Sequence, residues 1–308
     1  MAKLSVVISV LNGAAVIEDC LKSVEWADEI IVVDHESTDG TLKIVKKYTN
    51  DIFSQPNDIT KIDIQKNFGF KKAKHEWILS IDADERIDDE LQKEIKEVIE
   101  HMYQDAYAIP RKNIIFGKWI KHSIWWPDYQ IRLFRKGRAE YVDAVVHKDI
   151  QVKGTVGKLT NPLTHENYQT VSQYLQKMDV YTESEALSFI KNNTHFSWIE
   201  AVRMPIGDFL KTFFFQRGYK DGFHGLVLSV LQGFYMFLVV IKVWEKQGFR
   251  EENDKHFLKN LLREWERYQK EVSYWFMVSF IQSSGNFIEK IPYRLKRKYL
   301  DQKLKKEF

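Results

Sequence analysis

Short runs rich in valine and isoleucine alternate, in the first half of the chain, with stretches in which apolar residues recur every three or four positions. The first pattern predicts β-strands and the second predicts helices. Strands are expected at Leu4 to Val10, Glu29 to Asp34, Asp51 to Phe53 and Trp77 to Ile81, and helices at Ala14 to Val24, Thr41 to Tyr48, Ile62 to Lys74 and Glu90 to Met102. This alternation predicts an α/β fold with a mostly parallel sheet, which binds ligands at the carboxyl ends of its strands.

Acidic residues stand where two of these strands end. Asp34 is the first polar residue after four apolar ones, and an acid at that place can hold a ribose hydroxyl or the edge of a base. Asp82 and Asp84 follow the central buried strand, and carboxylates so placed suit Mg²⁺ or Mn²⁺, which completes its shell with water and substrate phosphates. The alternative is an acidic loop that caps the next helix, which itself begins with Asp88 and Asp89.

Composition limits the class of protein. With 308 residues, 44% of them hydrophobic, the chain can bury one core of ordinary size and a smaller attachment. The single cysteine, Cys20, excludes an internal disulfide and predicts a core thiol in a reducing compartment. A formal charge of +3 is too balanced to indicate a nucleic-acid partner. Lys3 and the apolar run after it are interpreted as a first strand and not as a signal peptide, which places the N-terminus inside the fold and in the cytoplasm.

The second half of the sequence is helical and rich in aromatic residues. The segment 225–241 is apolar except for Ser229 and Gln232, and basic residues flank it on both sides. It favours a helix lying on the membrane surface or dipping into one leaflet, with a full span or a core or dimer helix as alternatives. The basic tail from Asn286 to Phe308 fits anionic headgroups or a solvated chain end.

Four segments together carry a family resemblance: Leu4 to Asn12, V-D-H-E-S-T-D-G-T at 33–41, the group Lys66, Asn67 and Gly69, and D-A-D-E at 82–85. In order and spacing they resemble the GT-A glycosyltransferases of family 2. More narrowly, the chain resembles the lipopolysaccharide core glycosyltransferases of the heptose-modifying glucosyltransferase type. The resemblance implies a Rossmann-like domain that binds a nucleotide diphospho-sugar. It makes Asp34 a nucleotide contact, with Asn12, Lys66, Asn67, Asp82 and Arg132 as further donor contacts, and it places the metal at Asp82 and Asp84.

An inverting transfer also needs a base on the acceptor hydroxyl, opposite the departing nucleoside diphosphate. Asp128 is the first candidate, because P-D-x-Q-x-R-L-F is typical of these core transferases and the segment stands directly before a predicted strand. Relatives have an acid directly after His147, where this chain has Lys148, so Asp143 and Asp149 are rival candidates.

Several other residues of this region each have two interpretations. His147 is a further metal ligand or phosphate contact, or an ordinary strand histidine. Trp125 and Trp126 form an apolar wall for a sugar, or they only pack. Arg132 and Arg135 clamp a diphosphate or an anionic acceptor, or form surface salt bridges. His165 also matches the family, without a role that follows from the sequence.

These observations predict a GT-A catalytic domain at 1–170 and a helical, membrane-associating region at 171–308. The expected activity is transfer of a hexose, with inversion, from a nucleotide sugar such as a UDP-sugar to a lipid-linked or lipopolysaccharide acceptor. The expected location is the inner face of the cytoplasmic membrane. The rivals are a polyprenyl-phosphate sugar synthase and a non-catalytic sugar-binding or scaffold protein at the membrane.

Overall fold

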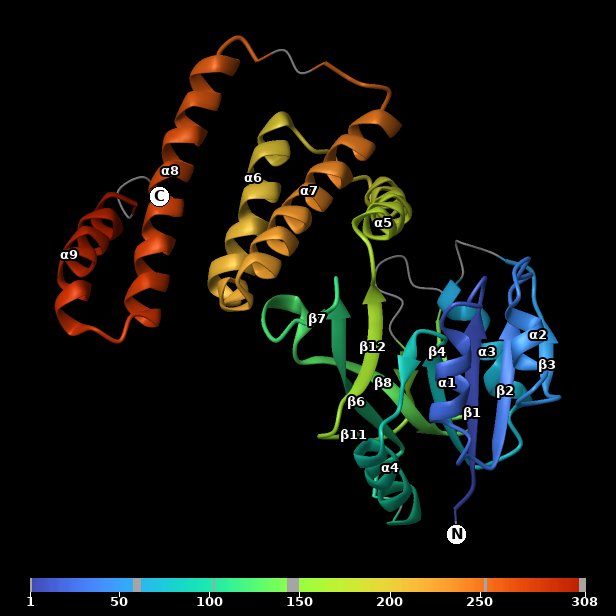
Figure 1. The fold of residues 1–308 in the computed structure, drawn as a ribbon. Coiled ribbons are helices and arrows are strands. Elements are labelled where there is room, and N and C mark those ends of the chain that lie inside the picture. The colour runs from blue at the N-terminus through green and yellow to red at the C-terminus, as the bar shows by residue number, and fades with distance from the viewer. Residues whose placement is uncertain (1, 58–61, 102, 143–149, 252–253, 305–308) are drawn as a thin grey trace. The chain divides into compact units, whose positions relative to one another are not determined.

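The computed structural model describes residues 2–57, 62–101, 103–142, 150–251 and 254–304. The chain forms two compact units, which are coloured by residue number in Figure 1. The sheet unit comprises Met1–Lys121 and Trp125–Gln173, and the helical unit comprises His122–Ile124 and Tyr174–Phe308. Each unit is described separately.

The first half of the sheet unit is parallel. β1 lies at its centre and pairs with β2 on one side and β4 on the other, and β3 pairs with β2. In spatial order the strands are β3 (Ile52–Ser54), β2 (Glu29–Asp34), β1 (Leu4–Val10) and β4 (Trp77–Asp82). The helices of this half are α1 (Ile17–Ser23), α2 (Thr41–Val45), α3 (Ile62–Lys72) and α4 (Asp89–His101). The carboxyl ends of the parallel strands meet at one edge, where α/β folds bind their ligands.

The second half of the sheet is mixed. β8 pairs antiparallel with β4 and with β6, β12 pairs parallel with β6, and β5 pairs antiparallel with β12. Because β8 runs against β4, its first residues lie toward the edge at which β4 ends. The strands are β5 (Glu85–Arg86), β6 (Ala106–Ile115), β7 (Lys118–Trp119), β8 (Asp128–Arg135), β11 (Val156–Lys158) and β12 (Leu163–Tyr168), with a separate pair β9 (Ala139–Tyr141) and β10 (Ile150–Val152) and a 3-10 turn at Ser123–Trp125.

Apolar side chains fill both faces of the parallel strands. On one face Ile8 packs in a cluster with Leu21 of α1 and Ile95 of α4, and on the other Val7 packs with Phe70 of α3. A fully buried side chain of this size contributes about 1.5–3 kcal/mol. α3 lies against β1 at Gly69, where an added Cβ would be 2.5 Å from Cγ1 of Val7. Glycine is therefore required there by close approach.

The helical unit consists of α5 (Val171–Lys191), α6 (Trp198–Leu210), a π-helical turn (Lys211–Phe215), a 3-10 turn (Gly218–Asp221), α7 (Phe223–Lys246), α8 (Phe257–Ser283) and α9 (Phe287–Leu304). α6 begins with a capping box, in which Glu200 accepts from the backbone N–H of Ser197 at 2.8 Å. Such a box satisfies backbone donors that the first helical turn leaves unpaired.

Within the described residues, α7 is the one helix long and apolar enough to cross a membrane. Only 33% of its most apolar window is buried, which is unlike a helix at the centre of a soluble core. Its exposed side chains include Leu226, Val230, Phe234, Phe237 and Trp244. Spacings of three, four and seven residues place them along one stripe.

The predicted α/β domain followed by helices is confirmed. Helix limits differ in places from the expected ones. α1 begins at Ile17 and not at Ala14, because the carbonyl of Gly13 accepts from the N–H groups of Val16 and Ile17 in a turn. α2 ends at Val45, and residues 46–48 form a turn. Membrane association of the helical unit stays a prediction.

Candidate active site

Two of the predicted acids flank β1 at the carboxyl edge. The register places Asp34 of β2 opposite Val10 and Asp82 of β4 opposite Ser9. Both side chains therefore come from strands that border the same central strand, at its end. This is the arrangement that the sequence predicted for these strand ends.

Hydrogen bonds lock together the loops that follow β1 and β2. Asn12 has a positive φ of 50°, and its Oδ1 accepts from the N–H of Thr38 at 2.8 Å, while its own N–H donates to Ser37 Oγ at 2.8 Å. Asp39 Oδ2 accepts from the N–H of Ala14 at 3.0 Å. Asn12 and Asp39 therefore hold these two loops together. The hydrogen bonds that Asn12 makes in the structure are to protein groups of the second loop.

Asp34 keeps one acceptor atom without a partner. Its side chain is 2% exposed, and Oδ2 accepts from the N–H of Ser37 at 3.1 Å. Oδ1 is buried and has no hydrogen-bond partner among the described residues. Buried polar atoms of this kind are rare in folded proteins, and a hydroxyl or N–H of a ligand would satisfy it.

Asp82 lies between two cations. Lys66 Nζ is 2.7 Å from its Oδ1 and Arg132 Nη2 is 2.6 Å from its Oδ2. Burial alone would raise the pKa of Asp82, but the charges of Arg132 and Lys66 outweigh burial and hold the pKa well below its usual range. Lys66 and Arg132 are themselves buried. They orient this carboxylate, and it stays ionised.

Glu85 ties the turn after β4 to the sheet. The side chain is 0% exposed, its Oε2 accepts from the N–H of Asp82 at 2.9 Å, and its Oε1 accepts from Arg132 Nη2 at 2.5 Å. Arg86 holds the same turn from the other side, since its guanidinium donates to the carbonyls of Ala83 at 2.9 Å and of Val16 at 2.5 Å. The D-A-D-E turn is thus fixed by two charged side chains.

A second ion pair lies at the start of β8. Arg111 of β6 donates from Nε and Nη2 to Asp128 Oδ2 at 2.8 and 2.6 Å, and Asn113 Nδ2 is 3.3 Å from the same oxygen. Gln130 Nε2 donates to Asp128 Oδ1 at 2.8 Å. Arg111 also lies 4.0 Å from Glu85, so the buried carboxylate of Glu85 borders both ion pairs.

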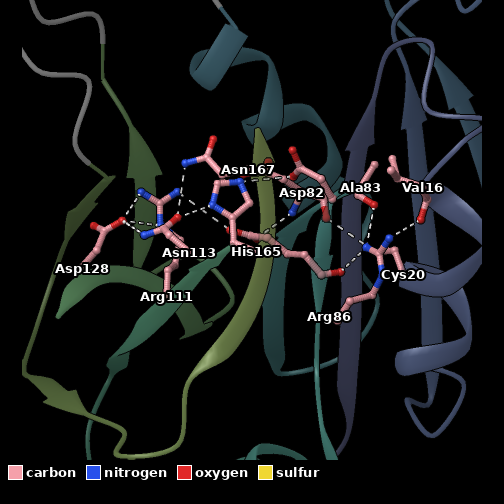
Figure 2. A network of polar contacts seen from close by, with 12 residues as sticks. Val16, Cys20, Asp82, Ala83, Arg86, Arg111, Asn113, Asp128, His165 and Asn167 are labelled. Carbon is pink, nitrogen blue, oxygen red and sulfur yellow. Dashed lines mark hydrogen bonds and ion pairs between the residues drawn. The ribbon is translucent and has the colours of Figure 1, made fainter. Parts of the chain in front are cut away.

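His165 belongs to this network, which Figure 2 shows from close by, and its ring approaches Asp84. The His165 ring contacts Asn113 Oδ1 through Nδ1 at 2.7 Å, and its Nε2 is 3.6 Å from Asp84 Oδ1. Asn113 Nδ2 donates to the carbonyl of Trp125 at 3.0 Å and to Asp128, which fixes Oδ1 as the acceptor. His165 Nδ1 must therefore carry a proton.

With the proton on Nδ1, Nε2 is the ring nitrogen of His165 that can bind a metal, and it lies 3.6 Å from Asp84 Oδ1. The described residues contain no group of three His, Cys, Asp or Glu side chains arranged around a metal position. Mg²⁺, however, takes one or two protein ligands and completes its shell with phosphates and water. Asp84 and His165 fit a cation bound in that way.

Other predicted site residues contact a different part of the protein or lie outside the described residues. Asn67 clamps the backbone of Tyr141, donating to its carbonyl at 2.7 Å and accepting from its N–H at 2.9 Å. Asp143, His147 and Asp149 lie outside the described residues. The assignments of donor, metal and base residues therefore stay predictions.

Sequence reasoning did not single out Glu85, Arg111 or Asn113. Glu85 belongs to the quoted D-A-D-E motif, and its position after two acids is the sequence feature that could have indicated it. Arg111 and Asn113 alternate along β6, so they share one face of that strand. The partners of that face lie on β8 and β12, and no spacing within the sequence indicates them.

The family model of glycosyl transferase family 2 matches residues 5–150. An uncharacterized glycosyltransferase of Rickettsia typhi is 32% identical over 258 residues, which cover 80% of this chain and 88% of that protein. The lipopolysaccharide core biosynthesis glycosyltransferase LpsC of Rhizobium meliloti is 25% identical over 253 residues, covering 80% of this chain and 94% of LpsC. A crystal structure of Staphylococcus aureus TarS with UDP-GlcNAc aligns over 82% of this chain and 95% of that one, at 15% identity and a TM-score of 0.45.

The mixed sheet with acids at the ends of its parallel strands, together with the family match, defines a GT-A transferase. The chain belongs to glycosyl transferase family 2, and it is an enzyme. The predicted resemblance is therefore confirmed.

Proposed function

We propose that this enzyme moves a hexose, with inversion, from a UDP-sugar to a hydroxyl of a lipopolysaccharide-core or other lipid-linked acceptor. Two positions at one sheet edge carry the proposal: Oδ1 of Asp34, which has no hydrogen-bond partner in the part of the chain that the structure describes, and the Asp84–His165 pair. The first suits a nucleoside, and the second suits a cation on its diphosphate. The acceptor class is supported by the similarity to LpsC.

The donor would lie across the ends of β1, β2 and β4. Asp34 Oδ1 would accept from a ribose hydroxyl or from the N–H of uracil, both of which are donors. The loops joined by Asn12 would border the nucleoside. Lys66 and Arg132 would act on the donor indirectly, because both are already bound to Asp82.

Asp84 and His165 would hold Mg²⁺ or Mn²⁺. The cation, when bound, would neutralise charge that develops on the departing diphosphate. A cation is needed because the nearby basic groups are matched by acids: Arg132 contacts both Asp82 and Glu85. Little positive charge is left to balance a diphosphate.

Asp128 would act as the base. Its Oδ2 accepts three contacts from Arg111 and Asn113, whereas Oδ1 accepts one from Gln130. Oδ1 is therefore the oxygen that would take the acceptor proton. The acceptor oxygen would form its bond to the anomeric carbon as the bond from that carbon to the diphosphate oxygen breaks on the opposite side, and UDP would leave. Asp143 and Asp149 remain rival bases.

The helical unit would bring the enzyme to the inner face of the cytoplasmic membrane. The exposed stripe of α7 supports this location, because exposed apolar area on a helix of 24 residues needs a covering partner. α9 adds Lys290, Arg294, Lys296, Arg297 and Lys298, which would attract anionic headgroups.

A panel of nucleotide hexoses tests the proposal, with UDP release measured in Mn²⁺ and in EDTA. We expect release with a UDP-hexose, and a loss of about 100-fold or more in Asp84→Ala and His165→Ala. Asp89→Ala, an acid at the start of α4, is the control and should retain activity. Mn²⁺ binding followed by electron paramagnetic resonance should weaken in the same two variants. Transfer to polyprenyl phosphate alone would point to the rival synthase, and release that is indifferent to both variants would refute the site.

A further inference from the structure

Besides Asp34, two residues at the ends of β1 and β2 each have a buried polar atom without a hydrogen-bond partner. The atoms are Oγ of Ser9, which is next to last in β1, and Nδ1 of His35, which directly follows β2. Neither atom has a partner within the described ranges of the chain. His35 is only 7% exposed, and buried polar groups are almost always paired in folded proteins. Both residues belong to the sheet unit.

Ser9 and His35 share the face of the sheet that α3 covers. The register pairs Ser9 with Asp82, whose carboxylate contacts Lys66 of α3. On its other side Ser9 pairs with Val33, which packs in the core cluster that includes α3. His35 is two positions beyond Val33, and its N–H donates to a carbonyl of β1 at 2.9 Å. The alternation of side chains therefore continues to His35 and turns it to the same face.

The two side chains are uncharged and can donate as well as accept. Burial lowers the pKa of His35, and the charge of Lys66 lowers it too, while the backbone of Pro56 and the charge of Asp34 act in the opposite direction. The neutral imidazole carries one proton, which either ring nitrogen can hold, and the hydroxyl of Ser9 can rotate. Such groups suit the neutral polar edge of a base better than a phosphate, which attracts charged partners.

The order of the strands separates His35 from the proposed cation position. β1 lies between β2 and β4, and His35 follows β2 whereas Asp84 follows β4. The ends of β2 and β4 are therefore two strand spacings apart, or about 10 Å. In a nucleoside diphosphate the ribose stands between the diphosphate and the base. A diphosphate bound through a cation at Asp84 would thus place its base at the end of β2.

The chain turns sharply directly after His35. Glu36 has a φ of 63°, a left-handed conformation that is costly for a residue other than glycine. Its carboxylate accepts from the N–H of Asn57 at 3.3 Å, which joins this turn to the segment after β3. Strained backbone of this kind clusters at ligand sites. Here it fixes the strand end, where the consecutive side chains of Asp34 and His35 leave on two sides and a ligand can lie across both.

We infer that Ser9 and His35 are specificity-determining residues that, together with Asp34, read the base of the nucleotide donor and select uracil. The carboxylate of Asp34 would accept from the ring N–H of uracil, which two carbonyl oxygens flank. In the tautomer with its proton on Nδ1, His35 donates to one of these oxygens, and the hydroxyl of Ser9 can donate to a carbonyl oxygen as well. Cytosine lacks that ring N–H and has an amino group in place of one carbonyl. The inference rests on the proposed function for the donor class, but binding does not require turnover.

Calorimetric titration of the full-length protein with Mn²⁺ present compares three ligands: UDP, CDP and pyrophosphate, which has no nucleoside. His35→Leu and Ser9→Ala each remove one of the polar atoms. His75→Leu is the matched control, because His75 stands before β4 at the opposite end of the sheet, where its N–H donates to Ser5 Oγ at 3.2 Å. Urea unfolding shows that each variant is folded before it is titrated.

We expect the wild type to bind UDP more tightly than CDP. His35→Leu should weaken UDP binding about tenfold and reduce the ratio of UDP to CDP affinity, and Ser9→Ala should change both in the same direction. Pyrophosphate affinity should stay the same in both variants, because the diphosphate is bound elsewhere, and His75→Leu should match the wild type with all three ligands.

An unchanged ratio of UDP to CDP affinity in both variants, or a loss of pyrophosphate affinity equal to that of UDP, would overturn the inference. Tighter binding of CDP than of UDP by the wild type would overturn it as well. Hexose transfer is scored separately, by activity with the panel of nucleotide hexoses. A failure of base selection is therefore distinguishable from a failure of the proposed function.

Discussion

Replacing Glu85 by glutamine removes one charge from the network that joins Asp82, Arg132 and Arg111, with little change in side-chain shape. The carboxylate of Glu85 accepts on both oxygens, from the N–H of Asp82 at 2.9 Å and from Arg132 at 2.5 Å. Glutamine has one acceptor oxygen, so its amide N–H₂ must face one of these donors. One contact becomes repulsive, and Arg132 keeps only Asp82 as a close carboxylate partner.

The size of the effect follows from those contacts. Loss of one hydrogen bond to a charged group in a buried position costs about 1.5–3 kcal/mol, and complete loss of a buried pair would cost about 3–5 kcal/mol. Because Arg132 retains Asp82 at 2.6 Å, the lower range applies to Glu85→Gln. The free energy of unfolding should fall by about 2 kcal/mol.

Donor binding should weaken as well, because the turn that carries Asp84 loses one of its two charged anchors. Urea unfolding measures the first effect, and calorimetric titration of UDP with Mn²⁺ measures the second. Glu29→Gln is the control: Glu29 is buried at the other end of the sheet and accepts from Ser5 at 2.6 Å and from the N–H of Lys74 at 2.9 Å. It should lose stability but keep UDP affinity. Unchanged UDP affinity in Glu85→Gln, or an equal loss in Glu29→Gln, would refute the reasoning.

Three further outcomes are expected. Asp34→Ala should weaken UDP binding about 10- to 100-fold by calorimetry, since a buried acceptor for a ligand donor is lost; wild-type affinity would exclude Asp34 as a contact. The low pKa of Asp82 means that its ionisation stabilises the fold above the unfolded value of about 3.9, and that this contribution disappears as pH falls through the lower folded pKa. Urea midpoints from pH 6 down to pH 3 should therefore fall more steeply for the wild type than for Asp82→Asn, and parallel curves would contradict this. Gly69→Ala should lower the free energy of unfolding by about 1–3 kcal/mol, because its Cβ would lie 2.5 Å from Val7 Cγ1 and 3.0 Å from Val33 Cγ2; an unchanged melting temperature would show that α3 can move away.

The local pattern of apolar and polar residues was sufficient to predict the parallel strands. β1 and β4 are short apolar runs that end in polar residues, and a strand buried on both faces has that composition. The positions of Asp34 and Asp82 at one edge follow, since parallel strands end on the same side. The exact start of α1 and the exact end of α2 did not follow, because turns compete with the first and last helical residues.

The contacts within the site depend on distant parts of the chain. Arg132 meets Asp82 across 50 residues of sequence, and His165 meets Asn113 across 52. These pairs arise from the antiparallel order β4-β8-β6 and from β12 returning beside β6. The spacing of residues along the sequence does not indicate this order of strands in the sheet. For this reason the ion pair between Arg132 and Asp82 and the central position of Glu85 in the network were not predicted.

The sheet also limits how this protein can associate. The strands at the two ends of its path, β3 and β5, have three and two residues. An exposed strand edge is a template for pairing with other chains, and very short edge strands remove most of that template. Growth of the sheet by backbone pairing of another chain along β3 or β5 is therefore disfavoured.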